Sequence, residues 1–146
     1  MLNYILELYS HYPVKVFHSA GVAVGTHFLT LRYFGNPLYH VSGALSYYIG
    51  SLLDHISTIP YIELANTPKF KELGLHRVFE ETSPILGSHP SMRRYLSRSI
   101  PIDLLMIGVS LVFPPLGYSR LSISPIIFLI NRKVSRELED RLREYI

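Results

Sequence analysis

Residues 38–62, LYHVSGALSYYIGSLLDHISTIPYI, form an apolar and small-residue run that is long enough to cross a bilayer, yet they contain an acid, Asp54. A helix needs about 20 residues to cross the hydrocarbon core of a membrane. A polar stripe on a helix of that length is expected to face other helices or a wet cavity rather than lipid. The polar residues that share one helical face in this run are His40, Tyr47, Ser51, Asp54, Thr58 and Tyr61.

The composition also favours a membrane protein. Only 17% of the 146 residues are charged, compared with about 25% in soluble domains, and the length fits a single domain. The absence of cysteine excludes disulfides and thiolate metal sites. The formal net charge of +3 comes from basic residues beside apolar runs, which is typical of membrane topology rather than of a nucleic-acid surface.

A second apolar run, residues 14–34, has a centre of small residues in which Gly21 and Gly25 form a GxxxG pair. Small residues let two helix backbones approach closely, which drives helix association in lipid. The turn signal at 35–37 predicts that the runs on either side of it are antiparallel neighbours. We therefore expect these two runs to pack together as the core of the protein. The matching small residues of the second run are Ser42, Ser46 and Gly50.

The rest of the chain divides into apolar and polar segments. Residues 100–118 and 119–131 are shorter apolar segments, separated by a turn signal at Gly117-Tyr118-Ser119. They are either two thin spans lengthened by their charged flanks or a re-entrant hairpin buried against the first two runs. The polar segments are an amphipathic interfacial helix at 1–12, a connection at 63–99 and a charged helix at 132–146. The predicted class is thus an all-α membrane bundle, an antiparallel helix pair with two shorter membrane segments.

The distribution of Lys and Arg predicts the orientation. The connection at 63–99 and the tail at 132–146 are rich in basic residues, whereas the turns near Gly35 and Gly117 are poor in them. Because cytoplasmic loops carry the excess of positive charge, we expect a multi-pass protein of the cell membrane with both termini in the cytoplasm. The lipid bilayer is the expected partner, the small-residue helix faces offer contacts for homo- or hetero-oligomers, and no nucleic-acid partner is expected.

Asp54 is the strongest candidate for a functional residue, because a carboxylate inside a membrane helix is costly unless other groups satisfy it. We expect a polar intramembrane site formed by Asp54, His55 and Thr58 with His18 and Tyr47. A metal ligand, a proton carrier and a contact for a polar substrate are the open functional roles.

Two structural alternatives remain open for the same acid. The first is an interhelical hydrogen bond to His18, Thr26 or Thr30. The second is a position close to the cytoplasmic headgroups, since Asp54 lies eight residues before Ile62, at the end of the apolar run.

A candidate metal site lies in the connection, within HRVFEETSPILGSH at 76–89. His76 and Glu80 are one helical turn apart, and Glu81 and His89 are close to them in sequence. Imidazole and carboxylate ligands suit a divalent metal such as zinc, manganese or iron. The alternative for a His–Glu pair at this spacing is a surface salt link, and no established metal motif is present.

Two short patterns, D-x-x-x-T from Asp54 to Thr58 and E-x-S-P from Glu81 to Pro84, carry a family resemblance. The chain resembles small bacterial and archaeal membrane proteins of unknown function with four spans, an intramembrane Asp-Thr signature and a later E-x-N-P. Ser83 stands where that pattern has Asn. The resemblance implies a fold and a topology, with Asp54, Thr58, Glu81 and Pro84 as the matching positions.

The signatures of serine hydrolases, P-loop enzymes and dinucleotide-binding enzymes are absent from the sequence. We therefore expect a small polytopic membrane protein that acts as a binding, transport-related or assembly subunit, with a polar site around Asp54. The alternative is a membrane-embedded metal-dependent enzyme whose site lies at the cytoplasmic rim.

Overall fold

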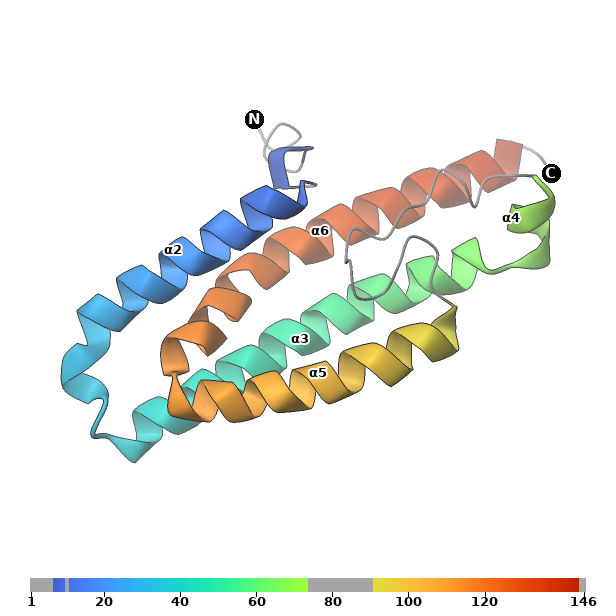
Figure 1. Ribbon diagram of the computed structural model, residues 1–146. Helices are drawn as coiled ribbons and strands as arrows, with labels where there is room; N and C mark the ends of the chain where they lie inside the picture. The colour runs from blue at the N-terminus through green and yellow to red at the C-terminus, as the bar shows by residue number, and fades with distance from the viewer. Residues whose placement is uncertain (1–6, 10, 74–90, 145–146) are drawn as a thin grey trace.

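The computed structural model describes residues 7–9, 11–73 and 91–144, and every regular element in these ranges is a helix (Figure 1). The all-α class predicted from the sequence is therefore confirmed. The long helices are α2 (Tyr12–Thr30), α3 (Pro37–Ala65), α5 (Met92–Val112) and α6 (Pro114–Glu144). A 3-10 turn, η1 (Leu31–Tyr33), follows α2, and a short helix, α4 (Pro68–Glu72), follows α3.

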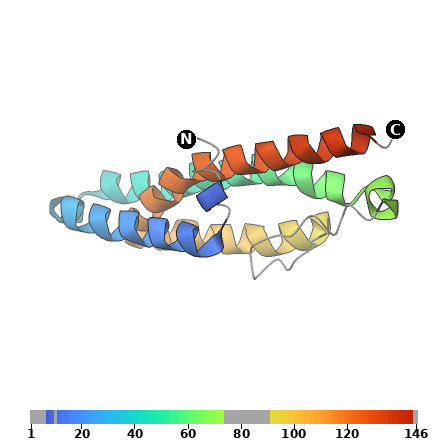
Figure 2. The same ribbon diagram turned by 90° about the horizontal axis from the view of Figure 1, so that it is seen from above.

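The long helices run side by side (Figures 1 and 2), in the order α2, α6, α3, α5 across Figure 1. Helix α6 packs against α2 on one side and α3 on the other, while α5 packs mainly along α3. The predicted core, residues 14–34 against 38–62, is therefore wrong, because beyond their turn α2 and α3 are separated by α6. A Cβ at Gly21 or Gly25 would meet nothing within 4 Å, so the GxxxG pair takes no part in this packing.

Small residues instead bring α3 and α6 together. A Cβ added at Gly43 would lie 2.5 Å from the Cα of Pro114, and one at Gly50 would lie 2.8 Å from Ser124 Oγ. The close approach that small residues permit in membranes thus operates between α3 and α6. The prediction that small residues of 38–62 mediate helix packing is confirmed at Gly50, but their partner is α6 and not residues 14–34.

The chain reverses at Phe113, and Pro114 and Pro115 begin α6. Proline is favoured in the first helical turn, where its missing N–H is not needed. The predicted break at Gly117-Tyr118-Ser119 is therefore wrong, because these residues lie inside α6. The apolar segments join their charged flanks as continuous helices of 21 and 31 residues, which does not fit a re-entrant hairpin.

Polar and small residues line much of the inside of the bundle, while large apolar residues cover much of its outside. Ser46, Ser51, Ser110 and Ser124 are buried. Two of these serines donate to a carbonyl one turn back in their own helix, Ser110 to Met106 (2.8 Å) and Ser124 to Arg120 (2.7 Å). The exposed residues, here called the apolar band, include Phe17, Phe28 and Leu29 on α2, Leu38, Leu45, Ile49 and Ile56 on α3, and Leu104, Leu105 and Val112 on α5.

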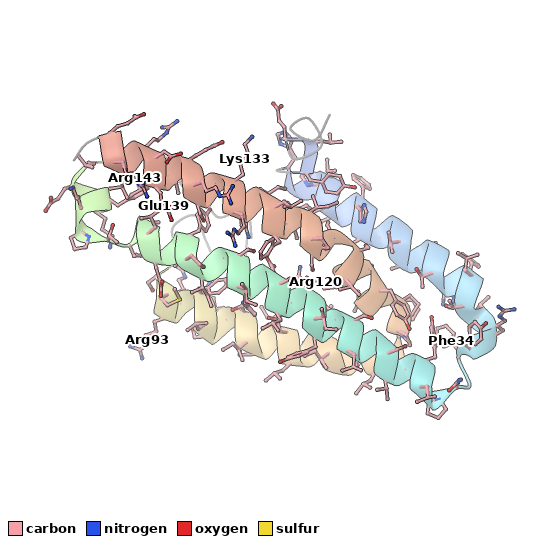
Figure 3. All side chains as sticks on the ribbon, turned by 180° about the vertical axis from the view of Figure 1, so that it is seen from behind. Phe34, Arg93, Arg120, Lys133, Glu139 and Arg143 are labelled. Carbon is pink, nitrogen blue, oxygen red and sulfur yellow. The ribbon has the colours of Figure 1, made fainter. Side chains whose placement is uncertain are left out.

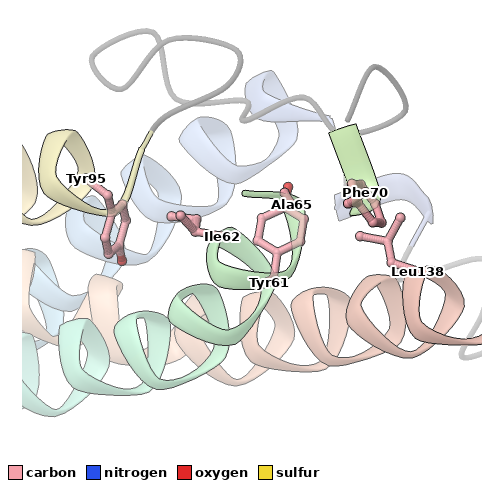
Figure 4. Packing of buried hydrophobic residues seen from close by; sticks show 6 residues of the cluster. All are labelled: Tyr61, Ile62, Ala65, Phe70, Tyr95 and Leu138. Atoms are coloured by element: carbon pink, nitrogen blue, oxygen red, sulfur yellow. The ribbon is translucent and has the colours of Figure 1, made fainter. Parts of the chain in front are cut away.

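A core of buried apolar side chains lies at the end of the bundle that contains α4, the end of α3 and the start of α5. Its buried apolar residues, here called the basic-end cluster, are Tyr61, Ile62, Ala65, Phe70, Tyr95 and Leu138 (Figure 4). Val134 and Leu142 pack against this cluster, so the charged helix predicted at 132–146 has an apolar side that lies against the ends of α3 and α4. Charged residues such as Arg93 and Arg143 lie at this end, and Phe34 lies at the opposite end (Figure 3).

Among the helices described, α5 is the one that is both long and apolar enough to cross a membrane, and only 11% of its apolar window is buried. The others fall short because polar side chains interrupt them, such as Lys15 in α2, Asp54 in α3 and Arg120 in α6. A bundle of four spans therefore does not follow from helix hydropathy. The predicted interfacial helix at 1–12 falls largely outside the described residues, although 7–9 are helical.

Candidate functional site

Asp54 forms an ion pair with Arg120 across the interface between α3 and α6. Arg120 Nη2 donates to Asp54 Oδ2 at 2.6 Å, and the two side chains are 25% and 24% exposed. Thr58, one turn further along α3, donates from Oγ1 to Asp54 Oδ1 at 3.4 Å. The predicted association of Asp54 with Thr58 is thus present, and the acid has an interhelical partner.

Gly50 lets Arg120 reach across to α3. A Cβ at Gly50 would lie 3.1 Å from Cγ of Arg120, so a larger residue would obstruct the stem of the arginine. The ring of Tyr47, one turn before Gly50, lies beneath the guanidinium, with 5.9 Å from Arg120 Cζ to the ring centroid. An aromatic face stabilises a cation that water no longer fully surrounds. Figure 3 shows Arg120 at mid-length of the bundle, away from the basic residues at its end.

His55 connects two residues of α5. Its Nε2 lies 2.6 Å from Asp103 Oδ2, and its Nδ1 lies 2.5 Å from the hydroxyl of Tyr95. A carboxylate only accepts, so Nε2 carries a proton and donates to Asp103. A tyrosine hydroxyl both donates and accepts, so Nδ1 keeps its partner whether or not it carries a proton. His55 can therefore gain or lose a proton without losing either hydrogen bond.

Tyr47 joins the two acid–base pairs. Its hydroxyl donates to Asp103 Oδ1 at 3.4 Å, while its ring contacts Arg120. The result is a continuous network of side chains from α3, α5 and α6, here called the interior network: Asp54, Arg120, Tyr47, Asp103, His55 and Tyr95.

The formal charges of the interior network balance in only one protonation state of His55. Asp54 and Asp103 supply two negative charges and Arg120 one positive charge, so a neutral His55 leaves the network at −1. A proton on His55 brings the sum to zero. An uncompensated charge removed from water is costly, so the two protonation states of His55 differ in how well the charges of the network are compensated.

A cavity of about 170 Å³ lies beside this network, between α3 and α5. Its lining includes His55 and Asp103, but its surface is almost entirely apolar, with contributions from Tyr48, Leu52 and Leu104. These three side chains also belong to the exposed outer surface of the bundle, so the cavity opens towards the surroundings of the apolar band. The cavity can therefore admit an apolar group beside the interior network.

The structure brings together some of the predicted site residues. Asp54, Thr58, His55 and Tyr47 share one region, but His18 lies elsewhere, with its Nε2 3.1 Å from Ser122 Oγ and its Nδ1 2.6 Å from the Tyr9 hydroxyl. The predicted hydrogen bonds from Asp54 to His18, Thr26 or Thr30 are therefore not the ones observed. Thr30 bonds instead to the carbonyl of Thr26 and to the Tyr39 hydroxyl.

Sequence reasoning missed three members of the interior network. The turn predicted at Gly117-Tyr118-Ser119 makes Arg120 only the lone basic residue near a turn, not a residue inside a helix. The sequence does indicate that Arg120 is unusual, because it is an isolated basic residue between the apolar segments at 100–113 and 121–130. Asp103 was a second isolated charge in such a segment, whereas nothing in the local sequence distinguishes Tyr95.

The candidate metal site at His76, Glu80, Glu81 and His89 lies outside the described residues, as does Pro84. Within the described residues, no group of three or more His, Cys, Asp or Glu side chains could hold a metal ion. Asp54 and Asp103 each lie beside a basic partner, and not beside further acids.

No protein-family model, curated protein or solved structure matches this chain. The functional argument therefore rests on the geometry described above.

Proposed function

We propose that this is a multi-pass membrane protein in which α2, α3, α5 and α6 cross the bilayer, and that the interior network binds and releases a proton as part of a transport-related function. The observation that carries the proton-binding role is that His55 holds both hydrogen bonds in either protonation state, beside two acids and one arginine.

The apolar band supports the membrane part of this proposal. Its exposed residues extend over 16–31 in α2 and the start of η1, 38–56 in α3 and 100–112 in α5, which corresponds to roughly 20 to 30 Å of helix. A bilayer core is about 30 Å thick. In lipid, large apolar side chains have no incentive to be buried, and small residues mediate helix contacts instead. Helix α6 is covered by its neighbours, so it needs little apolar surface of its own.

The change in packing along the bundle supports a boundary between lipid and water. Beyond Ile56 in α3 and Leu129 in α6, the large apolar residues described are buried or partly buried, apart from Leu73, and several of them form or contact the basic-end cluster. Burial of apolar side chains is the effect of water. The basic residues near this end, which include Lys69, Arg93 and Arg143, favour a cytoplasmic location, so both termini would face the cytoplasm.

The position of the interior network along the bundle supports access for protons from the cytoplasmic side. Asp54 precedes the last exposed apolar residue of α3, Ile56, by only two positions, and Asp103 follows the first of α5, Ile100, by three. Tyr95 links His55 to the basic-end cluster. The network therefore lies close to the proposed cytoplasmic boundary, where water can deliver a proton.

Single-cysteine labelling tests the topology. Because the sequence contains no cysteine, each introduced cysteine is the only thiol that can react. In membrane vesicles, cysteines at Phe28, Leu45, Leu105 and Leu129 should resist a membrane-impermeant maleimide, because lipid suppresses thiolate formation. A cysteine at Asp140, which is exposed in the tail, is the matched control and should react from the cytoplasmic side. Rapid labelling at all four apolar positions would contradict the membrane assignment.

Nitrogen-15 NMR of histidine side chains in liposomes tests proton binding. We expect one histidine signal, lost in His55→Gln, to report both the neutral and the protonated imidazole when the pH is varied. A His55 signal that reports a single form at every pH at which the protein stays folded would contradict the proposal.

A further inference from the structure

The cavity between α3 and α5 opens outwards, and one face of α5 connects it to the basic start of that helix. We infer that one phospholipid with an anionic headgroup binds here, with an acyl chain in the cavity and its phosphate at Arg93. The inference rests on the membrane assignment made above, because it names the lipid that covers this face of the bundle. It does not depend on proton binding by His55.

The cavity suits a segment of acyl chain. Its surface is almost entirely apolar, and Leu104 and Tyr48, which are 66% and 52% exposed, form its outer rim. Its volume is about 170 Å³, and an apolar cavity of roughly 150 Å³ can hold a six-carbon ring. An apolar chain loses no hydrogen bonds in such a place, so part of one lipid tail fits better than a polar ligand.

The polar residues of the lining do not oppose an apolar occupant. Asp103 accepts from His55 at 2.6 Å and from Tyr47 at 3.4 Å, and the other ring nitrogen of His55 is bonded to Tyr95. Burial of polar groups is costly mainly where they are left without partners. An acyl chain in the cavity therefore covers this side of the interior network and keeps water from it.

Arg93 lies in line with the cavity on α5. It is followed in steps of four, three, four and three by Ser97, Ile100, Leu104 and Ile107. At this spacing all five residues share one face of the helix. The last three line the cavity, and Arg93 is exposed near the start of α5, with its side chain directed away from the bundle (Figure 3). A lipid whose tail lies in the cavity can thus extend along this face to Arg93.

The distance along this face matches the depth of a phospholipid headgroup. Arg93 precedes Ile100, the first exposed apolar residue of α5, by seven positions, which is about 10 Å of helix. Headgroups occupy about 5 to 8 Å on each side of the hydrocarbon core. A long basic side chain can also extend along the membrane normal to reach a charged partner, so the guanidinium of Arg93 can reach the level of the phosphates.

The charge at this place favours an anionic headgroup. Arg94 is exposed beside Arg93, and within the described residues neither arginine forms an ion pair with an acid. The free N–H groups at the start of α5 add positive partial charge, and arginine pairs with phosphate through two parallel hydrogen bonds. A second copy of the chain, related by a two-fold axis along the bundle, would bring the same arginines together, so like charges disfavour it as the occupant.

Tryptophan quenching tests the inference, because the chain contains no tryptophan of its own. The full-length protein with Tyr48→Trp at the rim of the cavity is placed in vesicles of phosphatidylglycerol and phosphatidylcholine in equal amounts. Brominated acyl chains quench tryptophan on contact, so brominating one lipid at a time reports which of the two occupies the cavity. We expect phosphatidylglycerol to be favoured about fivefold, the effect of one basic residue at a membrane surface.

Phe17→Trp, on the exposed side of α2, is the matched reporter away from the cavity. His18, next to it, bonds to Ser122 of α6, and Gly50, two residues after the first reporter, lies against Ser124. The two reporters therefore lie at similar levels along the bundle. At the second one, the two lipids should quench in proportion to their amounts.

Variants of Arg93 separate a headgroup site from the general basic charge of the protein. In the Tyr48→Trp background, Arg93→Gln should abolish the preference for phosphatidylglycerol, and Arg93→Lys should retain most of it. Arg143→Gln, which removes one exposed charge near the end of α6, is the matched control and should leave the preference unchanged. Because Arg93 is exposed, its replacement removes no buried contact.

Equal quenching by both lipids in Tyr48→Trp, or a preference that survives Arg93→Gln, would overturn the inference. Quenching in Phe17→Trp alone would also overturn it, since another protein surface would then cover the cavity. In each of these cases the membrane assignment would stand, because Phe17→Trp reports contact with lipid. If neither reporter is quenched, the membrane assignment fails, and the inference with it.

Discussion

Gly43 and Gly117 meet where α3 and α6 come closest, and a Cβ added at Gly117 would lie 1.8 Å from the carbonyl oxygen of Gly43. Such a position cannot hold a side chain unless the two backbones separate. Pro114 of α6 and Ser110 of α5 also lie against Gly43, so the start of α6 packs closely on α3. This contact fixes the register that brings Arg120 opposite Asp54.

Gly117→Ala should therefore destabilise the protein by about 3 kcal/mol, at the upper end of the usual cost of overpacking, because the obstruction is backbone. The free energy of unfolding can be measured by titration with a denaturing detergent. Gly108→Ala in α5 is the matched control, since a Cβ there meets nothing within 4 Å. Alanine should raise helix stability at that position by about 0.5 to 1 kcal/mol, so equal effects of the two substitutions would contradict the packing.

Local patterns predicted much of this fold. The polar stripe of 38–62 does face other helices, since Tyr47, Ser51, Thr58 and Tyr61 are buried. The turn predicted at 35–37 is also present, and the Leu38 N–H donates to the side chain of Asn36 at 3.0 Å where α3 begins. These features depend on residues close together in sequence, so the sequence alone is sufficient.

Which helices pack together was not predictable in the same way. The turn at 35–37 indicated neighbours, but in three dimensions α6 lies between α2 and α3. The partner of Asp54 is 66 positions away at Arg120, and that pairing depends on the contact of Gly43 with Gly117. A small-residue motif also does not indicate its own partner, as the open surface at Gly21 and Gly25 illustrates.

His27→Phe should stabilise the protein. His27 Nδ1 is buried, and among the described residues it has no hydrogen-bond partner. The imidazole lies among aromatic rings, with centroid distances of 5.3 Å to Phe34 and 5.4 Å to Phe113. Replacing an unsatisfied polar group with an apolar ring should raise the free energy of unfolding by about 1 kcal/mol. His27→Asn, which keeps a polar group at that position, should give no such gain.

Phe70→Ala should detach α4 from the basic-end cluster. The side chain of Phe70 is fully buried and packs with Ala65 and Leu138 (Figure 4). Loss of a buried phenylalanine costs about 3 to 5 kcal/mol in a well-packed core. Leu73→Ala, at a neighbouring and exposed position, is the control and should cost less than about 1 kcal/mol. Hydrogen exchange should also show α4 opening in Phe70→Ala while the backbone of α2 stays protected.

The Asp54–Arg120 pair should be strongly coupled despite its partial exposure. Removing one partner leaves the other charge between α3 and α6 without compensation, which is more costly than removing both. We expect Asp54→Asn and Arg120→Gln each to lower the free energy of unfolding by about 2 kcal/mol, and the double variant to lose less than the sum by about 1 to 2 kcal/mol. Lys133→Gln with Glu137→Gln is the reference cycle, because this pair is exposed, its atoms are 3.8 Å apart, and its coupling should not exceed about 0.5 kcal/mol. Strictly additive losses at Asp54 and Arg120 would show that the bond of 2.6 Å between α3 and α6 contributes no more than a surface contact.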